Sequence, residues 1–200
     1  MGISNARNRV VWLSLGILFA TTGITFWGHA AAQGSRQTQQ FDTVSVRTLR
    51  VVDEQGRPRF VIAAPLPNPV VEGKQMPRSS PVVGIQFLDI EGNETGGLAI
   101  IDKVDGAALC FDYNTAEAMC FTKARNYKGI TLLDPPAAKA NLGEPGSTRL
   151  ELSVDNGLPR IALCDKQGKE RIVLSLDASE NPVIETLDAE GKPISPAHKQ

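Results

Sequence analysis

Histidine is scarce in this 200-residue chain, which contains two. His29 adjoins a hydrophobic N-terminal stretch and His198 is the third residue from the C-terminus, so both lie outside the predicted folded region. A Ser-His-Asp triad, a Cys-His pair and a His-containing zinc site each need an imidazole held inside a pocket. These three chemistries are therefore excluded for the folded region, and no metal site or cofactor is predicted.

An excess of positive charge is also lacking. The chain has 21 Lys and Arg residues against 22 Asp and Glu residues, which gives a net charge of −1. The basic residues are scattered between acids, whereas nucleic-acid-binding proteins present a basic stripe with interleaved aromatic residues. We therefore expect no nucleic-acid partner.

The one long hydrophobic run lies at the N-terminus. Arg7 and Arg9 precede an uncharged stretch at 10–27, and small alanines follow it up to Ala32. This layout is typical of a secretory signal peptide, but the run is also close to the shortest length that spans a bilayer. Cleavage near Ala32 and membrane anchoring through residues 10–27 both remain open. In either case the rest of the chain is predicted to be exported, to the periplasmic or extracellular face.

The remaining chain reads as one β domain. No amphipathic helix is expected after Gln40, because Gly, Pro and β-branched residues interrupt every longer window. The predicted parts are a signal peptide or anchor (1–32), a polar linker (33–41), a single β domain (42–195) and a tail (196–200). The predicted strands cover 43–53, 58–64, 82–89, 96–102, 106–113, 117–123, 129–134, 148–154, 159–165, 169–177 and 182–188.

A short motif, D-x-x-G between apolar residues, recurs along this domain and predicts β-hairpins. The aspartate accepts hydrogen bonds from the following backbone amides, and the glycine takes the left-handed conformation that the turn requires. The turn residues are Asp53 and Gly56, Asp89 and Gly92, Asp165 and Gly168, and Asp188 and Gly191. Arg59 and Arg171, on the return strands, are expected within reach of Asp53 and Asp165 respectively.

Alternation of apolar and polar residues in the flanking segments predicts half-buried strands, with one face buried and the other exposed to solvent. The expected fold is an all-β antiparallel meander of D-x-x-G hairpins that closes as a barrel, a sandwich or a small propeller-like domain, preceded by one N-terminal hydrophobic helix. Two long proline-containing connections, 65–81 and 135–147, interrupt the meander, and loops of this length tend to be functional or disordered.

The region from Val46 to about Pro135 resembles a family of uncharacterised bacterial exported β-rich proteins. The family motif G-x-x-F-x-(N/D)-x-x-G-x-E-x-G-G-L is matched by residues 84–98. Further matching residues are Gly73 and Lys74, Pro77 and Arg78, Glu94, Gly96 and Gly97, and Asp112 and Tyr113. The resemblance implies a family, but no activity is assigned to that family.

One cluster of polar residues is a candidate catalytic or binding site. The topology could bring the carboxylates of Glu94, Asp89, Glu91 and Asp112 close to the cations of Lys74 and Arg78. Paired carboxylates act as acid and base when one is desolvated and its pKa rises. The alternatives are a solvated structural turn and a ligand or ion site. Gly96 and Gly97 are expected to permit close backbone packing or a bulge.

Cys110 and Cys120 are the candidate disulfide, since oxidation is possible in an exported chain and a hairpin centred on Thr115 would bring them face to face. The alternative is that they are small apolar core residues.

The leading functional prediction is a non-enzymatic extracytoplasmic β domain that binds an envelope protein or a surface polymer through its wet strand faces and long loops. Two alternatives stay open. One is a hydrolase-like or lyase-like enzyme that uses Glu94 with Asp112, Lys74 or Arg78. The other is a structural module that self-associates through its edge strands. Burial of Glu94 beside Arg78 or Lys74 in a pocket would favour the enzyme or a small-ligand site.

Overall fold

The computed structural model describes residues 38–194. The predicted N-terminal helix, the cleavage site and the anchor at 10–27 lie outside this range. By their mutual contacts, the residues fall into two compact units, Met1–Ser45 and Val46–Gln200. All strands of the described range belong to the second unit. Within 38–194 we find no helix with the length and apolar character needed to cross a bilayer. The helical content of that range is a single 3-10 turn, η1 (Asp102–Val104).

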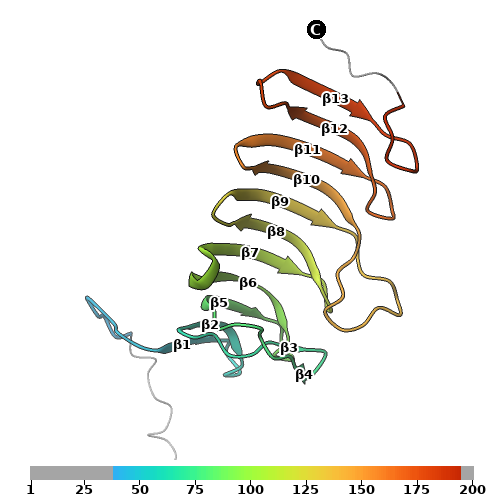
Figure 1. Ribbon diagram of the computed structural model, residues 1–200. Helices are drawn as coiled ribbons and strands as arrows, with labels where there is room; N and C mark the ends of the chain where they lie inside the picture. The colour runs from blue at the N-terminus through green and yellow to red at the C-terminus, as the bar shows by residue number, and fades with distance from the viewer. Residues whose placement is uncertain (1–37, 195–200) are drawn as a thin grey trace, which may run out of the picture. The chain divides into compact units, whose positions relative to one another are not determined.

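Eleven strands form one antiparallel sheet, in which each strand pairs with the next strand of that sheet along the chain, so that β2 pairs with β5 (Figure 1). They are β1 (Thr48–Val52), β2 (Pro58–Ala63), β5 (Val83–Leu88), β6 (Glu94–Ile101), β7 (Gly106–Asp112), β8 (Glu117–Lys123), β9 (Tyr127–Leu133), β10 (Thr148–Asp155), β11 (Leu158–Cys164), β12 (Glu170–Leu176) and β13 (Pro182–Thr186). The predicted all-β antiparallel meander is confirmed. The first long connection also contains a small hairpin of β3 (Val70–Val71) and β4 (Lys74–Gln75).

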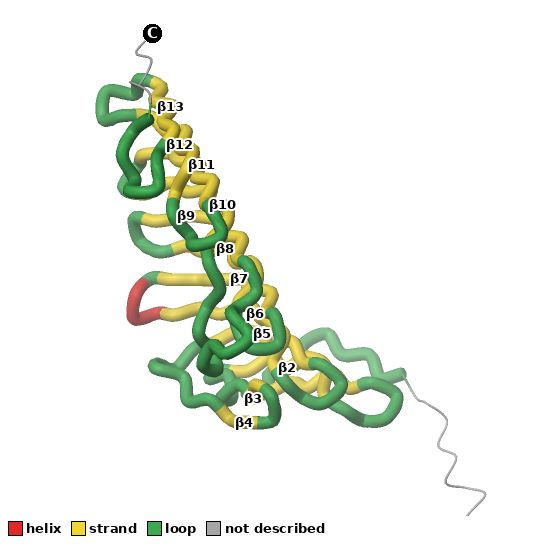
Figure 2. The backbone as a smooth tube through the Cα atoms, turned by 90° about the vertical axis from the view of Figure 1, so that its right-hand side faces the viewer, coloured by secondary structure: helices red, strands yellow, loops and turns green. Residues whose placement is uncertain are grey.

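The predicted closure is not found in the described part of the chain. The sheet runs from β1 at one edge to β13 at the other, and no pairing joins these two strands. Seen from the side, the strands of this sheet lie in one layer, and the β3–β4 hairpin lies apart from it (Figure 2). Local hairpins add each strand beside its predecessor, and this process by itself gives an open sheet; closure requires a further pairing of the two edges.

The aspartate turns share one geometry. In the turn at Asp165, the Oδ1 atom accepts hydrogen bonds from the backbone N–H groups of Gln167 (2.9 Å) and Lys169 (3.0 Å). Desolvation raises the pKa of Asp165, but the hydrogen bonds from Lys169, Arg171 and Gln167 outweigh it and hold this pKa below its usual value. The same two backbone bonds are present at Asp53, Asp89, Asp177 and Asp188.

One of the two arginine contacts expected at these turns was wrong. Arg171 donates to Asp165, with Nε 2.8 Å from Oδ2. Arg59, in contrast, donates to the backbone carbonyl of Leu88 at 3.1 Å. The carboxylate of Asp53 pairs instead with Arg57, whose Nε lies 2.8 Å from it. An arginine four residues after the aspartate is closer to the turn, so Arg59 is left to contact the neighbouring turn.

The two faces of the sheet have different side chains. On one face, which we call the apolar face, a row of directly paired residues crosses all eleven strands, and every member is aliphatic or aromatic. The row consists of Leu49, Ile62, Ile85, Leu98, Leu109, Phe121, Ile130, Leu152, Ile161, Leu174 and Ile184. Because side chains alternate along a strand, all of these point the same way.

A second row on the apolar face lies two residues away along each strand. It consists of Val51, Phe60, Phe87, Gly96, Phe111, Met119, Leu132, Leu150, Leu163, Ile172 and Thr186. The rings of Phe60 and Phe87 meet edge to face with centroids 5.6 Å apart, and the Phe111 ring lies 6.1 Å from that of Phe87, across the strand that carries Gly96. Neither row contains a charged residue.

The opposite face, which we call the small-residue face, carries small and polar side chains and contains the buried core. Val61 and Ala63 of β2 are buried there beneath Leu66 and Val82, which belong to the first long connection and the segment that follows it. The expectation of a buried apolar face was therefore wrong within residues 38–194. Long connections cover part of the small-residue face, whereas large side chains on the apolar face, such as Leu152 at 44% and Leu174 at 39%, are well exposed.

Candidate functional site

The predicted polar cluster is partly assembled in the structure around Glu94, at the beginning of β6. Both oxygens of the Glu94 carboxylate accept hydrogen bonds from Nη2 of Arg78, at 3.1 and 3.2 Å. The side-chain amide of Gln86 donates to the same carboxylate at 2.8 Å. The Glu94 side chain is 14% exposed and that of Arg78 is 20% exposed. Glu94 is thus a partly buried, fully paired carboxylate and does not lie at a solvated turn tip.

Two glycines allow the backbone to approach closely beside this cluster. Gly96 has φ +137°, and a Cβ atom there would lie 2.4 Å from the carbonyl oxygen of Cys110. A Cβ atom on Gly97 would lie 2.5 Å from the carbonyl oxygen of Ile85. Only glycine fits both positions without a backbone shift, because no side chain yields at these contacts.

Asp112 is the carboxylate whose protonation is most perturbed. It ends β7, and its Oδ1 atom is buried and accepts no hydrogen bond from the described residues. Desolvation raises the pKa of Asp112 to about 6; the negative charges of Glu94 and Glu117 act in the same direction, and Arg78 opposes them. Asp112 therefore exchanges its proton closer to neutral pH than an ordinary carboxyl group.

The cluster borders two small hollows of the surface. Their volumes are about 230 and 190 Å³, and both are lined by Arg78, Glu94, Asp112 and Glu117. Because Glu94 already accepts three hydrogen bonds, the carboxylates left to accept a proton or a ligand donor in these hollows are Asp112 and Glu117.

The other predicted members form no hydrogen bond or ion pair with Glu94, although Asp89 and Glu91 line a further hollow of about 240 Å³ with it. Lys74 is exposed in the β3–β4 hairpin and forms no ion pair with any residue in 38–194. Asp89 uses its Oδ1 atom for the backbone N–H groups of Glu91 (2.9 Å) and Asn93 (2.8 Å), while Glu91 itself is exposed. Although desolvation raises the pKa of Asp89, the hydrogen bonds from Asn93 and Glu91 lower it below its usual value. Asp89 is a structural turn residue.

Gln86 belongs to the cluster although no motif pointed to it. Its side chain is 2% exposed and is the largest that is fully buried in the described chain. The one signal in the sequence is a polar residue in the middle of the apolar strand β5. A buried amide needs partners, and Glu94 supplies an acceptor.

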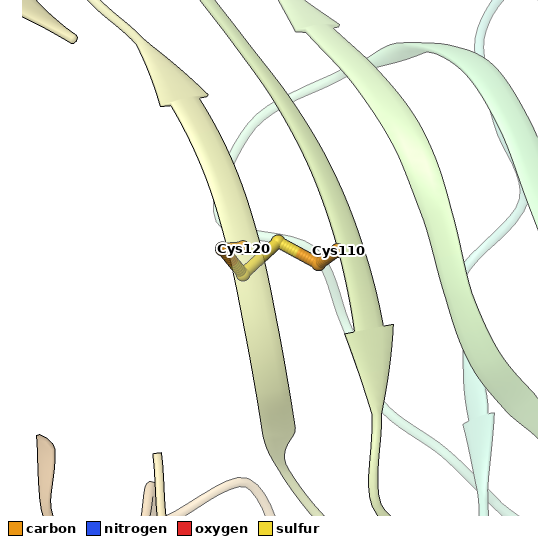
Figure 3. The surroundings of a disulfide bond; sticks show 2 residues. All are labelled: Cys110 and Cys120. Atoms are coloured by element: carbon orange, nitrogen blue, oxygen red, sulfur yellow. A yellow bond between two sulfur atoms is a disulfide. The ribbon is translucent and has the colours of Figure 1, made fainter. Parts of the chain in front are cut away.

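A disulfide joins the candidate cysteines at the next pair of strands. Cys110 of β7 and Cys120 of β8 are directly paired in the sheet, and their sulfur atoms are bonded (Figure 3). They lie on the small-residue face, at the same level as Gln86 and Gly97. Cys164 is a free, half-buried thiol.

A larger hollow lies elsewhere, on the apolar face. It is an open groove of about 620 Å³ that does not include Glu94. Its floor includes Leu109, Phe121, Ile130, Leu152 and Ile161 from the first apolar row. Soluble proteins rarely leave a continuous apolar surface of this kind exposed, and such surfaces mark interaction sites. The apolar face is therefore the second candidate functional site.

No protein-family model matches this chain, and none of the curated proteins searched matches it either.

Proposed function

We propose that this protein is a non-enzymatic, exported binding domain that docks another protein against its apolar face. The observation that carries this proposal is the uninterrupted apolar row from Leu49 on β1 to Ile184 on β13. Hydrophobic side chains that remain exposed across a whole sheet gain free energy when a partner removes them from water.

The chemistry of the face favours a protein partner over a surface polymer. In the two rows, Thr186 is the one side chain with a hydroxyl group, and no carboxylate, amide or guanidinium is present. A hydroxyl-rich polymer binds through placed hydrogen-bonding groups, because its own polar groups must be satisfied when they are buried. Another protein that exposes Leu, Ile or Phe side chains has no such requirement.

Site-specific photo-cross-linking in the cell envelope tests the proposal. A photoreactive phenylalanine is placed at Leu152 on the apolar face or at Thr131 on the small-residue face of the full-length chain. We expect protein adducts from position 152 and at least tenfold fewer from position 131. Equal yields from both positions, or no adduct from position 152, would contradict docking through the apolar face.

A specific observation supports a second candidate function, a hydrolase-like or lyase-like activity in which Asp112 acts as the acid or base beside Glu94 and Arg78. The pKa of about 6 places the proton exchange of Asp112 near the pH at which general acid–base catalysis is effective. Hydrolysis of a panel of ester, amide and glycoside substrates would be measured for the exported protein and for Asp112→Asn. Turnover that follows the ionisation of a group near pH 6 and disappears in Asp112→Asn would support this activity, and equal turnover in both proteins would exclude a role for Asp112.

A further inference from the structure

We infer that the partner covering the apolar face is a second copy of this chain, bound face to face. This inference rests on the proposed function, because it assigns an occupant to the same surface. It differs from association through the edge strands, since the contact would be made by side chains along the whole sheet.

The length of the apolar row limits what can cover it. Eleven strands spaced about 4.8 Å apart give a row about 50 Å long. A single helix would need more than 30 residues to cover that length, at about 1.5 Å per residue. A second copy presents an apolar row of the same length and the same strand spacing, so two copies can pack along the entire face.

The area is also sufficient for a specific dimer. Two adjacent rows make a strip about 50 Å long and about 15 Å wide, or roughly 800 Å² on each copy. Stable protein–protein interfaces bury about 800 Å² per partner. A continuous apolar patch on a monomer seldom exceeds about 600 Å². The strip therefore exceeds what a monomer ordinarily exposes and reaches what a dimer needs.

The two apolar rows carry no charge that would repel an identical face. Lys123 and Lys128, which line the groove, belong to the row beyond the first one, at the side of the strip. Lys123 is held by Asp105, with Nζ 2.9 Å from its backbone oxygen and in an ion pair with its carboxylate. Two copies can therefore approach without burying an unpaired charge in the centre of the contact.

A contact between identical surfaces needs projecting and recessed features on the same surface. The apolar face has both. The feature offered for insertion is the pair of exposed rings Phe60 and Phe111, at 44% and 43% exposure, and the recessed feature is the groove over β6 to β11. In a two-fold arrangement each copy would supply one of each, as in a β-sandwich whose two sheets pack about 10 Å apart.

Co-purification of two differently tagged full-length copies tests the identity of the partner. The copies are expressed together, cross-linked in the cell through their surface lysines and purified through one tag. We expect the second tag in the product, at the mass of two copies or of a larger closed set of copies. Leu174→Asp in both copies should reduce the recovered second tag at least tenfold, whereas Ser175→Asp on the small-residue face should leave it within twofold.

Each outcome decides between the two proposals. Amide hydrogen exchange in β11 to β13 reports that this part of each variant has folded. Absence of the second tag would overturn the second copy as the partner. If position 152 still gives adducts with another protein in that case, the proposed docking function stands with a different occupant. If position 152 gives no adduct, the proposed function fails as well.

Discussion

The charged form of Asp112 destabilises the folded chain. Its side chain is partly removed from water, Glu94 and Glu117 repel its charge, and its buried Oδ1 atom accepts no hydrogen bond from the described residues. Each of these features favours the protonated form of the carboxyl group. The native chain therefore binds a proton at Asp112 at a pH where the unfolded chain has already released it.

This difference predicts how the free energy of unfolding depends on pH. The unfolded pKa of Asp112 is the ordinary 3.8 and the folded pKa is about 6, so stability should fall as pH rises from about 4 to about 6 and then level off. A shift of two pKa units corresponds to nearly 3 kcal/mol, but partial exposure screens it to about 1–2 kcal/mol. Asp112→Asn should remove this loss and stabilise the protein by about that amount at pH 7.5.

Urea denaturation of both proteins at pH 4.5 and pH 7.5 measures the effect. Asp102→Asn, at an exposed carboxylate of η1, is the matched control and should leave the pH dependence of the wild type unchanged. The assignment would be refuted by an Asp112→Asn variant that loses as much stability as the wild type between the two pH values.

The residues around Glu94 differ in how well they could be predicted from the sequence. Glu94 and Arg78 stood in a recognisable motif, but their ion pair depends on a connection of more than a dozen residues folding back onto β6. Gln86 could be suspected only as a polar residue in an apolar strand. Gly96 and Gly97 indicated close backbone packing or a bulge, but that the neighbours are the carbonyl oxygens of Cys110 and Ile85 is a tertiary feature that the local sequence does not contain.

At the scale of elements, the aspartate turns explain why the strand assignments succeeded. Each turn encloses its own hydrogen bonds, from the aspartate side chain to two backbone amides, so a local pattern determines the hairpin. The turn between β12 and β13 escaped notice because Glu180 stands where the other turns have glycine. Asp177 nevertheless accepts the same bonds, from Ser179 (2.8 Å) and Asn181 (3.0 Å).

That exception predicts a stabilising substitution. Glu180 has φ +63°, a left-handed conformation that costs a residue with a Cβ atom about 1–2 kcal/mol, whereas glycine adopts it freely at a cost of about 0.5–1 kcal/mol in unfolded-state entropy. Glu180→Gly should therefore stabilise the protein by about 0.5 kcal/mol.

Conversely, Gly56→Ala should destabilise it by about 1 kcal/mol, although its new Cβ would meet nothing within 4 Å.

Denaturant midpoints of the purified variants give both values. Ser179→Gly, one residue before Glu180 and outside the positive-φ position, should lower stability and so serves as the control for added flexibility. If Glu180→Gly and Ser179→Gly destabilise equally, backbone strain at Glu180 is not significant.

At the scale of the whole sheet, the sequence predicted correctly which strands are neighbours, but its prediction that the sheet closes was wrong within residues 38–194. The period-two alternation and the turn residues predict that consecutive strands are neighbours in the sheet. The observed strand order from β1 to β13 agrees with this prediction. Whether the two edges meet depends on accumulated twist and on what covers each face, which are not local properties. The alternation of Leu150, Leu152 and Val154 predicted an apolar face, but it could not indicate that no part of residues 38–194 covers that face.

An open meander also has a distinctive stability, because each strand makes its main contacts with its two neighbours in the sheet. Structures of this kind behave as linear arrays in which a local defect is felt mainly by adjacent elements. Leu174→Ala on β12 and Ile62→Ala on β2 remove similar, partly exposed side chains from the same apolar row, at 39% and 42% exposure. Each should weaken its own end of the sheet by about 1 kcal/mol.

Amide hydrogen exchange followed strand by strand distinguishes a linear array from a single cooperative unit. Leu174→Ala should accelerate exchange about fivefold in β11 to β13 and leave β1 to β5 unchanged, and Ile62→Ala should do the reverse. The strands around the Cys110–Cys120 disulfide should exchange most slowly in both variants, because that bond links β7 to β8 in the middle of the sheet. If either substitution accelerates exchange equally in all eleven strands, the sheet unfolds as one cooperative unit, and the description of it as a linear array is wrong.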